Sequence, residues 1–226
     1  MKAIIVTDFA YKGPKRKGRG TGHQGLRATL KYLQYRDNRD LHVQQGENVE
    51  RWVDHGLGQH YRAIFENCDK LHSKHVLAWT WVISPAPDLM ALVPVEQRRD
   101  LVLDLTERIV EDYYTSRGFD VPEYSYVLHN RLTESEDGSE PMQHLHTHVV
   151  LPGTAPLAGT DRQAVYNNKE KGHDALFRDI ASRHFGEALD RLVGPEWRKL
   201  REEEPELEQP NPPLPYGDNL DDWFPR

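Results

Sequence analysis

The sequence predicts an α+β fold, in which a central antiparallel β-sheet is flanked by helices in a two-layer or three-layer sandwich. Three runs rich in aromatic and β-branched residues, at 76–84, 123–129 and 143–151, are typical of strands. The last two are separated only by a polar loop, so we expect them to pair as antiparallel neighbours. Stretches with apolar residues at helical spacing lie around these runs and are expected to cover the sheet.

The N-terminal part of the chain is expected to hold one strand and two helical regions. Residues 2–6 form a short β-rich run, and a loop rich in glycine, lysine and arginine follows it. A helix is predicted over about 24–36, and a polar helical region is predicted over about 47–72. The first helix has a buried stripe of leucines at i, i+4 and i+7: Leu26, Leu30 and Leu33.

The C-terminal part is expected to hold two long helices, because apolar residues recur at helical spacing over 94–117 and again over about 174–192. Residues 130–141 are predicted to form a polar hairpin loop. A fourth strand is expected at 163–167. A Gly-Pro pair after the last long helix opens a final short helix, since proline suits a first helical turn.

Length and cysteine content exclude several classes of protein. A chain of 226 residues can bury a core without disulfides or metal staples. The single cysteine, Cys68, excludes a disulfide framework and a zinc site made of several cysteines. No stretch approaches the roughly 18 apolar residues of a membrane span, and the N-terminus does not have the pattern of a secretion signal. We therefore expect a cytoplasmic protein.

The charge is unevenly distributed, although the net value is only -7. Residues 202–226 hold eight acids and one base in a proline-rich segment, so we expect a folded domain at 1–201 and a poorly ordered acidic tail at 202–226. Residues 9–36 hold eight Lys or Arg and no acid. Such a basic block on a neutral body indicates local contact with a polyanion, and a solvated basic loop is the alternative.

A cluster of histidines is the strongest chemical signal. Three of them alternate along the strand predicted at 143–151: His144, His146 and His148. Residues at i, i+2 and i+4 of a strand share one face, and hairpin pairing can bring His129 from the preceding strand beside them. An apolar run directly after the cluster argues against solvated surface histidines. We interpret the cluster as a metal site with open positions for substrate.

The residues around the cluster favour phosphoryl transfer. No carboxylate occurs within 143–151, which argues against the usual hydrolytic and cupin-like sites, so a separate residue is expected to supply the nucleophile. Tyr32 and Tyr35 lie on the first helix, turned away from its leucine stripe, and Arg36 follows Tyr32 by four residues. A neighbouring arginine lowers the cost of a phenolate. Exposed tyrosines are also routine on amphipathic helices.

Taken together, these motifs resemble the relaxases, the HUH endonucleases that nick plasmid DNA for conjugative transfer. The matching pieces are LKYLQYRD, WVISPAPD and VLHN…EPMQHLHTHVVLPG, in the family's order and over roughly residues 1–192. The resemblance implies that Tyr32 is the nucleophile and Ser84 a phosphate contact. It also implies a set of metal ligands, with His144 as an accessory or alternative ligand: His129, His146 and His148.

The motifs also depart from the family's pattern. Many relatives carry an acid two residues after the first histidine, where Arg131 stands here, and the residue between the paired histidines is usually a bulky hydrophobe rather than Thr147. A register with Leu145 between His144 and His146 is the alternative. Tyr166, in VYNNKE, matches the Tyr-x-x-Lys of rolling-circle replication initiators. The candidate nucleophiles are therefore ranked Tyr32, Tyr166 and Tyr35.

The function expected from the resemblance is that of a metal-dependent, site- and strand-specific DNA nickase and transesterase. It would form a 5′-phosphotyrosyl intermediate on single-stranded DNA at an origin of transfer, with an accessory or coupling protein as a further partner. The implied cofactor is a divalent metal ion, Mn or Mg first, with Zn or Ni as alternatives. The expected DNA contacts are mostly basic: Lys12, Lys15, Arg16, Lys17, Arg19, Arg27, Arg36 and Ser84.

Three other functions remain open at this point. One is a replication initiator or transposase that uses Tyr166. Another is a histidine-metal enzyme that acts on small molecules. The last is a DNA-binding accessory without catalytic activity.

Overall fold

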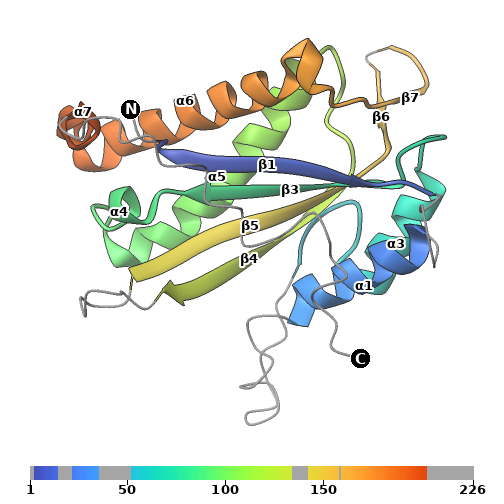
Figure 1. Ribbon diagram of the computed structural model, residues 1–226, viewed down its shortest axis with the longest axis horizontal. Coiled ribbons are helices and arrows are strands. Elements are labelled where there is room, and N and C mark those ends of the chain that lie inside the picture. Colours follow the sequence, from blue (N-terminus) through green and yellow to red (C-terminus); the bar gives the residue numbers. More distant parts are fainter. Residues whose placement is uncertain (1–2, 15–21, 36–51, 134–141, 158, 203–226) are drawn as a thin grey trace, which may run out of the picture.

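The computed structural model describes residues 3–14, 22–35, 52–133, 142–157 and 159–202. Its centre is a five-stranded sheet in which every pair of neighbours is antiparallel (Figure 1). This confirms the predicted α+β class. In spatial order the strands are β1 (Ile5–Lys12), β3 (Ala78–Pro85), β5 (Met142–Pro152), β4 (Tyr124–Thr133) and β2 (Val53–His55).

Helices pack on both faces of this sheet. The long helices α5 (Val95–Thr115) and α6 (His173–Val193) cover one face. The helices α1 (Gly22–Tyr35) and α3 (Tyr61–Lys70) lie side by side on part of the other face (Figure 1). Smaller elements complete the described chain: α4 (Pro87–Met90), the hairpin of β6 (Thr154–Pro156) and β7 (Arg162–Ala164), the 3-10 turns Lys169–Lys171 and Pro195–Arg198, and α7 (Lys199–Glu202).

Alternation along the strands produces two separate cores. On β3, Trp79 and Trp81 belong to the core under α5 and α6, whereas Ala78 belongs to the core under α1 and α3. Side chains of successive strand residues point to opposite faces, which explains why neighbours in sequence enter different cores. Tyr124 on β4 joins the α5 and α6 side. These aromatic residues are therefore core residues.

The first predicted helix is confirmed, and its leucine stripe is buried. Leu26, Leu30 and Leu33 are each at most 5% exposed. The helix begins at Gly22, where a Cβ atom would lie 1.7 Å from the backbone oxygen of Gly13. Only glycine allows the chain to return this closely past the end of β1.

The region predicted as helical over 47–72 is only partly so, which corrects the prediction. Residues Val53–His55 form β2 and pair with β4, and α3 occupies Tyr61–Lys70. Between them, Asp54 Oδ1 accepts hydrogen bonds from the backbone N–H groups of Gly56 and Gly58, at 2.8 and 2.7 Å. Both glycines have positive φ, so this turn separates a strand from a helix in a sequence whose polar composition resembles a single helix.

Two other boundaries also differ from the prediction. The strand expected at 163–167 is β7, at Arg162–Ala164, and it pairs with β6 instead of joining the main sheet. β4 continues to Thr133, into the predicted hairpin loop, whose remaining residues 134–141 lie outside the described chain. Within the described residues, no helix has the length and apolar character that crossing a membrane requires.

Candidate metal centre

Three histidines converge on the sheet face that α1 and α3 partly cover. His129 on β4 lies directly opposite His146 on β5, and His148 follows two residues later on the same face. One nitrogen of each ring lies within 4.8 Å of the corresponding nitrogen in the others. All three side chains are buried. The strand pairing thus brings the imidazoles together, in a geometry that can hold one ion.

The opposite face of β5 fixes the orientation of this strand. Leu145 and Val149 enter the core under α5 and α6. Thr147, between the two paired histidines, lies 2.8 Å from the Thr106 hydroxyl of α5, Oγ1 to Oγ1. Because these residues anchor one face, the alternating histidines are held on the other.

For two of the histidines, hydrogen bonds determine which ring nitrogen carries a proton. His129 Nε2 lies 2.8 Å from the carbonyl oxygen of Leu33, and His146 Nδ1 lies 3.2 Å from the carbonyl oxygen of His144. A carbonyl oxygen only accepts, so each of these nitrogens is the N–H donor. In the neutral rings, Nδ1 of His129 and Nε2 of His146 are then the nitrogens that carry a lone pair. This pattern is typical of metal-ligating histidines.

The donor set fits a divalent transition metal. Three neutral imidazoles offer three nitrogen ligands of intermediate softness, which suit Zn, Ni or Mn better than Mg. Three protein ligands also leave coordination positions for a substrate oxygen, as in catalytic rather than structural sites. The described residues that form this group are His129, His146 and His148, with no carboxylate among them.

His144 lies beside this group but contacts a different partner. Its Nε2 is 2.7 Å from Oγ of Ser84, a buried residue on β3. Its backbone carbonyl accepts the hydrogen bond from His146. The structure therefore places His144 in contact with the centre, where it orients a neighbouring ring, and ties Ser84 to the same face.

Two of the candidate nucleophiles, Tyr32 and Tyr35, lie on α1, the helix that contacts the centre directly. Leu33, the neighbour of Tyr32, supplies the carbonyl that binds His129. Gln34 and Tyr35 face α3: Gln34 Oε1 accepts a hydrogen bond from the Tyr61 backbone at 2.7 Å, and the Tyr35 ring lies 6.3 Å from the Tyr61 ring. Helical geometry places Tyr32 on the flank of α1 that is turned away from α3.

Tyr166 lies on the other side of the sheet. Its backbone carbonyl accepts a hydrogen bond from Arg117, just after α5, at 2.7 Å. Val165, the residue before Tyr166, accepts a hydrogen bond at its carbonyl from the indole of Trp79, which lies in the core under α5 and α6. The structure thus brings the helix that carries Tyr32, but not the segment that carries Tyr166, to the histidine face. The Tyr166 side chain is 53% exposed.

The predicted basic contacts are only partly described. Lys12 ends β1, and Arg27 is exposed on α1. Five others lie outside the described residues: Lys15, Arg16, Lys17, Arg19 and Arg36. The carbonyl of Leu33 was not anticipated, because a backbone atom that orients a distant ring leaves no signal in the sequence.

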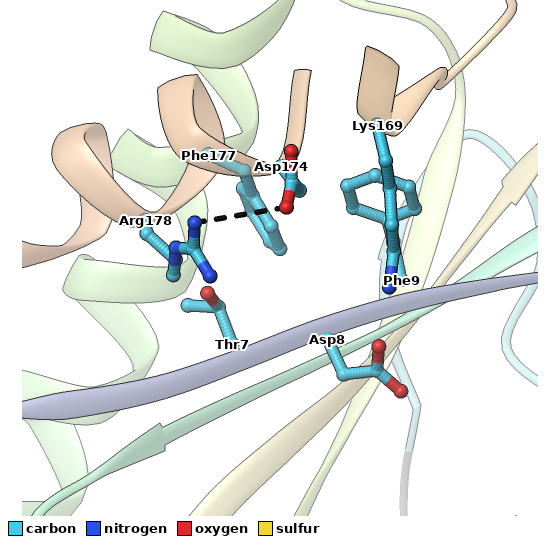
Figure 2. A pocket seen from close by; sticks show the side chains of 7 residues that line it. All are labelled: Thr7, Asp8, Phe9, Lys169, Asp174, Phe177 and Arg178. Atoms are coloured by element: carbon cyan, nitrogen blue, oxygen red, sulfur yellow. Dashed lines mark ion pairs between the residues drawn. The ribbon is translucent and has the colours of Figure 1, made fainter. Parts of the chain in front are cut away.

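A small pocket of about 60 Å³ lies elsewhere, between β1 and the start of α6 (Figure 2). Its charges are mixed, and Arg178 forms an ion pair with Asp174 at 3.6 Å. It lies along the edge of the sheet on the α6 side and contains none of the clustered histidines. Its lining residues are Thr7, Asp8, Phe9, Lys169, Asp174, Phe177 and Arg178.

Comparison with solved structures finds similarity to DNA-bound relaxases, the class that the sequence motifs resemble. Two of them are structures of the conjugative relaxase TrwC in complex with oriT DNA. The copper-bound one has a TM-score of 0.45 and 13% identity, and the match covers 83% of this chain and 70% of that chain. The metal-bound one has a TM-score of 0.46 and 14% identity, with 86% and 70% covered. No protein-family model matches the sequence. A search of curated proteins also gives no match.

Proposed function

We propose that this protein is a metal-dependent nickase and transesterase that acts on single-stranded DNA, with the role in plasmid mobilisation or conjugative transfer that its motifs imply. One observation carries the proposal. The three buried imidazoles of His129, His146 and His148 converge within 4.8 Å, and the helix that carries Tyr32 is hydrogen-bonded to this cluster through Leu33. A nitrogen-only centre beside a helix that carries a tyrosine suits a reaction in which the protein, not water, supplies the nucleophile.

In this proposal the histidines hold a divalent cation through Nδ1 of His129, Nε2 of His146 and one nitrogen of His148. The cation, when bound, polarises a non-bridging oxygen of the scissile phosphate. His144 and Ser84 stay on the same face as positioning residues, since the His144 carbonyl accepts a hydrogen bond from His146 and the His144 ring contacts Ser84. The hydrogen bond from His129 to Leu33 keeps α1 in a fixed position relative to the centre.

The proposed chemical step exchanges one phosphoester bond for another. The phenol oxygen of Tyr32 loses its proton and attacks phosphorus, so a bond forms between tyrosine and the 5′ phosphate. The bond from phosphorus to the 3′ oxygen breaks, and this oxygen takes up a proton and leaves as a hydroxyl. Because the phosphoester is conserved, the free 3′ hydroxyl can reverse the reaction and rejoin the strand.

Covalent trapping tests this function. The protein is incubated with a single-stranded DNA library and Mn²⁺ or Mg²⁺, adducts that resist SDS are isolated, and their DNA ends are sequenced. We expect adducts that share one cleavage sequence. We expect Tyr32→Phe to abolish them, because the ring remains but the attacking oxygen is lost, while Tyr35→Phe and Tyr166→Phe retain them.

Each other outcome assigns a different function. Adducts that persist in Tyr32→Phe and disappear in Tyr166→Phe would indicate a replication initiator or transposase. DNA binding without any adduct would indicate a DNA-binding accessory. A protein that binds metal but neither binds DNA nor forms an adduct would be assigned as a histidine-metal enzyme that acts on small molecules.

A further inference from the structure

α1 packs against α3, and the two helices form a second surface on the metal-bearing side of the molecule (Figure 1). His23 Nε2 and Asp69 Oδ1 join the two helices at 2.7 Å. At the other end, Gln34 accepts hydrogen bonds from the Tyr61 backbone and from the Trp52 indole. The relative position of the two helices is therefore fixed at both ends.

Three exposed cations of the two helices lie in the region of Tyr61, a buried tyrosine at the start of α3. Arg27 and Lys31 are exposed and one helical turn apart on α1, and Arg62 is exposed on α3. The Arg62 Nε–H donates to the Tyr61 hydroxyl at 3.2 Å. We call this set, together with Tyr61, the α1–α3 basic surface.

Within the described chain, no carboxylate forms an ion pair with this surface, and the nearest acid along α3 is the exposed Glu66, one helical turn after Arg62. Asp69, on α3, pairs with His23, and no Asp or Glu of the described residues forms an ion pair with Arg27, Lys31 or Arg62. On the other face of the sheet, by contrast, arginines of α5 and α6 pair with aspartates, as Arg183 does with Asp112.

The phenol of Tyr61 responds to this positive potential. The hydrogen bond from Arg62 lowers the pKa of Tyr61 below its usual value, although burial opposes the change. The charges of Arg62, Lys31 and Arg27 lower this pKa further.

We propose that the α1–α3 basic surface binds the phosphate backbone of single-stranded DNA, beyond the metal centre and on the opposite flank of α1. This inference rests on the proposed function for the nature of its ligand. A helix is about 10 Å wide, so a few nucleotides span the two flanks. The strand held at the histidines then continues over α1 to Arg62.

The chemistry of the surface favours a nucleic acid over a membrane. Cations alternate with rings, since His60 and Tyr61 lie 4.5 Å apart and Tyr35 lies next to Tyr61. Tyr61 is buried, but His60 and Tyr35 are partly exposed and offer stacking partners for bases, and the cations match phosphates. A membrane-binding surface needs large exposed apolar side chains, and in the described part of the chain none of these lies on α1 or α3.

The test measures DNA binding in the absence of metal. A fluorescent oligo(dT) of about 16 nucleotides, near the upper site size of such surfaces, is titrated with protein in EDTA at several salt concentrations. In Lys31→Ala/Arg62→Ala we expect the slope of log affinity against log salt to fall in magnitude by about 1.4, since each lost phosphate contact on a single strand removes about 0.7. Arg191→Ala, which removes an exposed cation from α6, should leave the slope unchanged.

A spectroscopic measurement supplements the titration. The Tyr61 phenol is followed by ultraviolet absorbance as the difference between the native protein and Tyr61→Phe. Saturating oligo(dT) should raise the pKa of Tyr61, because phosphates offset the cations around it. This signal does not depend on any variant at the cations themselves.

The outcomes separate this inference from the proposed function. If native protein forms adducts but the double variant keeps the native salt slope and the Tyr61 pKa does not respond, the inference is wrong and the proposed function stands. If the salt slope of the double variant falls as expected but no adduct ever forms, the DNA-binding surface is supported and the nickase function is not. The assignment to single-stranded DNA would be overturned if Arg191→Ala reduced the salt slope as much as the double variant does. It would also be overturned if a matched RNA or phosphatidylserine vesicles bound more tightly than oligo(dT).

Discussion

The histidines of the centre differ in what the second nitrogen of each ring contacts. His129 donates to Leu33 and His146 donates to the His144 carbonyl, so both rings are oriented by backbone oxygens. His144 is instead bonded through its ring to Ser84. A ring oriented in this way keeps a defined nitrogen toward the centre, which reduces the entropy lost when a metal binds.

Metal affinity provides a direct test at the scale of single residues. We expect His129→Ala, His146→Ala and His148→Ala each to weaken Mn²⁺ or Ni²⁺ binding by at least about 10- to 100-fold, the loss typical even of residues that only support a ligand. The loss of affinity in His144→Ala should lie at or below that range, because this variant removes a ring that contacts Ser84 and is not a ligand in the proposed set. Isothermal titration calorimetry measures the affinities, with His75→Ala, an exposed histidine outside the cluster, as the control.

A different order of losses would change the ligand set. If His144→Ala weakened binding as strongly as His146→Ala, while His148→Ala had little effect, the ligands would be His129, His144 and His146. The register with Leu145 between the paired histidines would then be correct.

At the scale of elements, a buried hydroxyl pair connects α5 to the strand that carries the histidines. The Thr106 hydroxyl donates to the carbonyl of Val102 at 2.8 Å, so the hydrogen bond with Thr147 uses the Thr147 proton. Thr106 is thus both a donor within its helix and the acceptor for β5. Both side chains are buried.

This direction predicts an asymmetry between two similar variants. Thr106→Val should lower the free energy of unfolding by about 1–3 kcal/mol, because it leaves the Thr147 hydroxyl buried without an acceptor. Thr147→Val should cost less than about 1 kcal/mol, since Thr106 keeps its bond to Val102. Urea denaturation compares the two. Equal losses would show that the hydroxyl direction is not the one inferred.

A carboxylate links α5 to α6. Burial raises the pKa of Asp112, but hydrogen bonds from Arg183 and His184 outweigh it and hold the pKa below the ordinary value of 3.8. The native state therefore binds this proton less readily than the unfolded chain. The stability that Asp112 adds is present above about pH 4 and is lost as the pH falls through its folded pKa.

We expect Asp112→Asn to lower the free energy of unfolding by about 1 kcal/mol at pH 7, the scale of a partly exposed charged hydrogen bond. The difference from the native protein should shrink as the pH falls below about 4. Denaturation at a series of pH values measures it. Asp104→Asn, which removes an exposed pair with Arg108 within α5, is the control and should cost no more than about 0.5 kcal/mol. A difference that stays constant down to acid pH would argue against this linkage.

At the scale of the whole molecule, the sheet separates a structural face from the face that carries the candidate site. The face under α5 and α6 holds the larger apolar core, and the other face presents the histidines, α1 and the α1–α3 basic surface. The rigid core on one side thus positions polar groups on the other. Residues 203–226, outside the described chain, carry seven acids and one base, a charge opposite to that of the basic surface.

Removal of residues 203–226 tests whether this acidic segment competes with DNA. The chain 1–202 should bind single-stranded DNA more tightly than the full chain at low salt, and the difference should vanish at high salt, because screening shortens the range of the interaction. A full-length variant with the seven acids replaced by Asn or Gln should behave like the truncated chain. Equal affinity of all three at low salt would exclude competition.

Local patterns were sufficient for much of the fold. Leucines at helical spacing indicated α1, aromatic and β-branched runs indicated β3, β4 and β5, and the polar hairpin indicated that β4 and β5 are neighbours. Alternation along β5 then predicted that its histidines share a face. The pattern failed at β2, where an Asp54-capped glycine turn lies inside a polar stretch that resembles one helix.

The sequence by itself determined the class of fold and the presence of an imidazole cluster, because periodicity and strand alternation are local properties of the chain. Only the tertiary structure decided which groups meet across long separations. The Leu33 carbonyl reaches His129 and Ser84 binds His144, while Tyr166 lies on the opposite face of the sheet. These contacts depend on strand order and helix packing, which the burial of two separate cores selects and which no local pattern encodes.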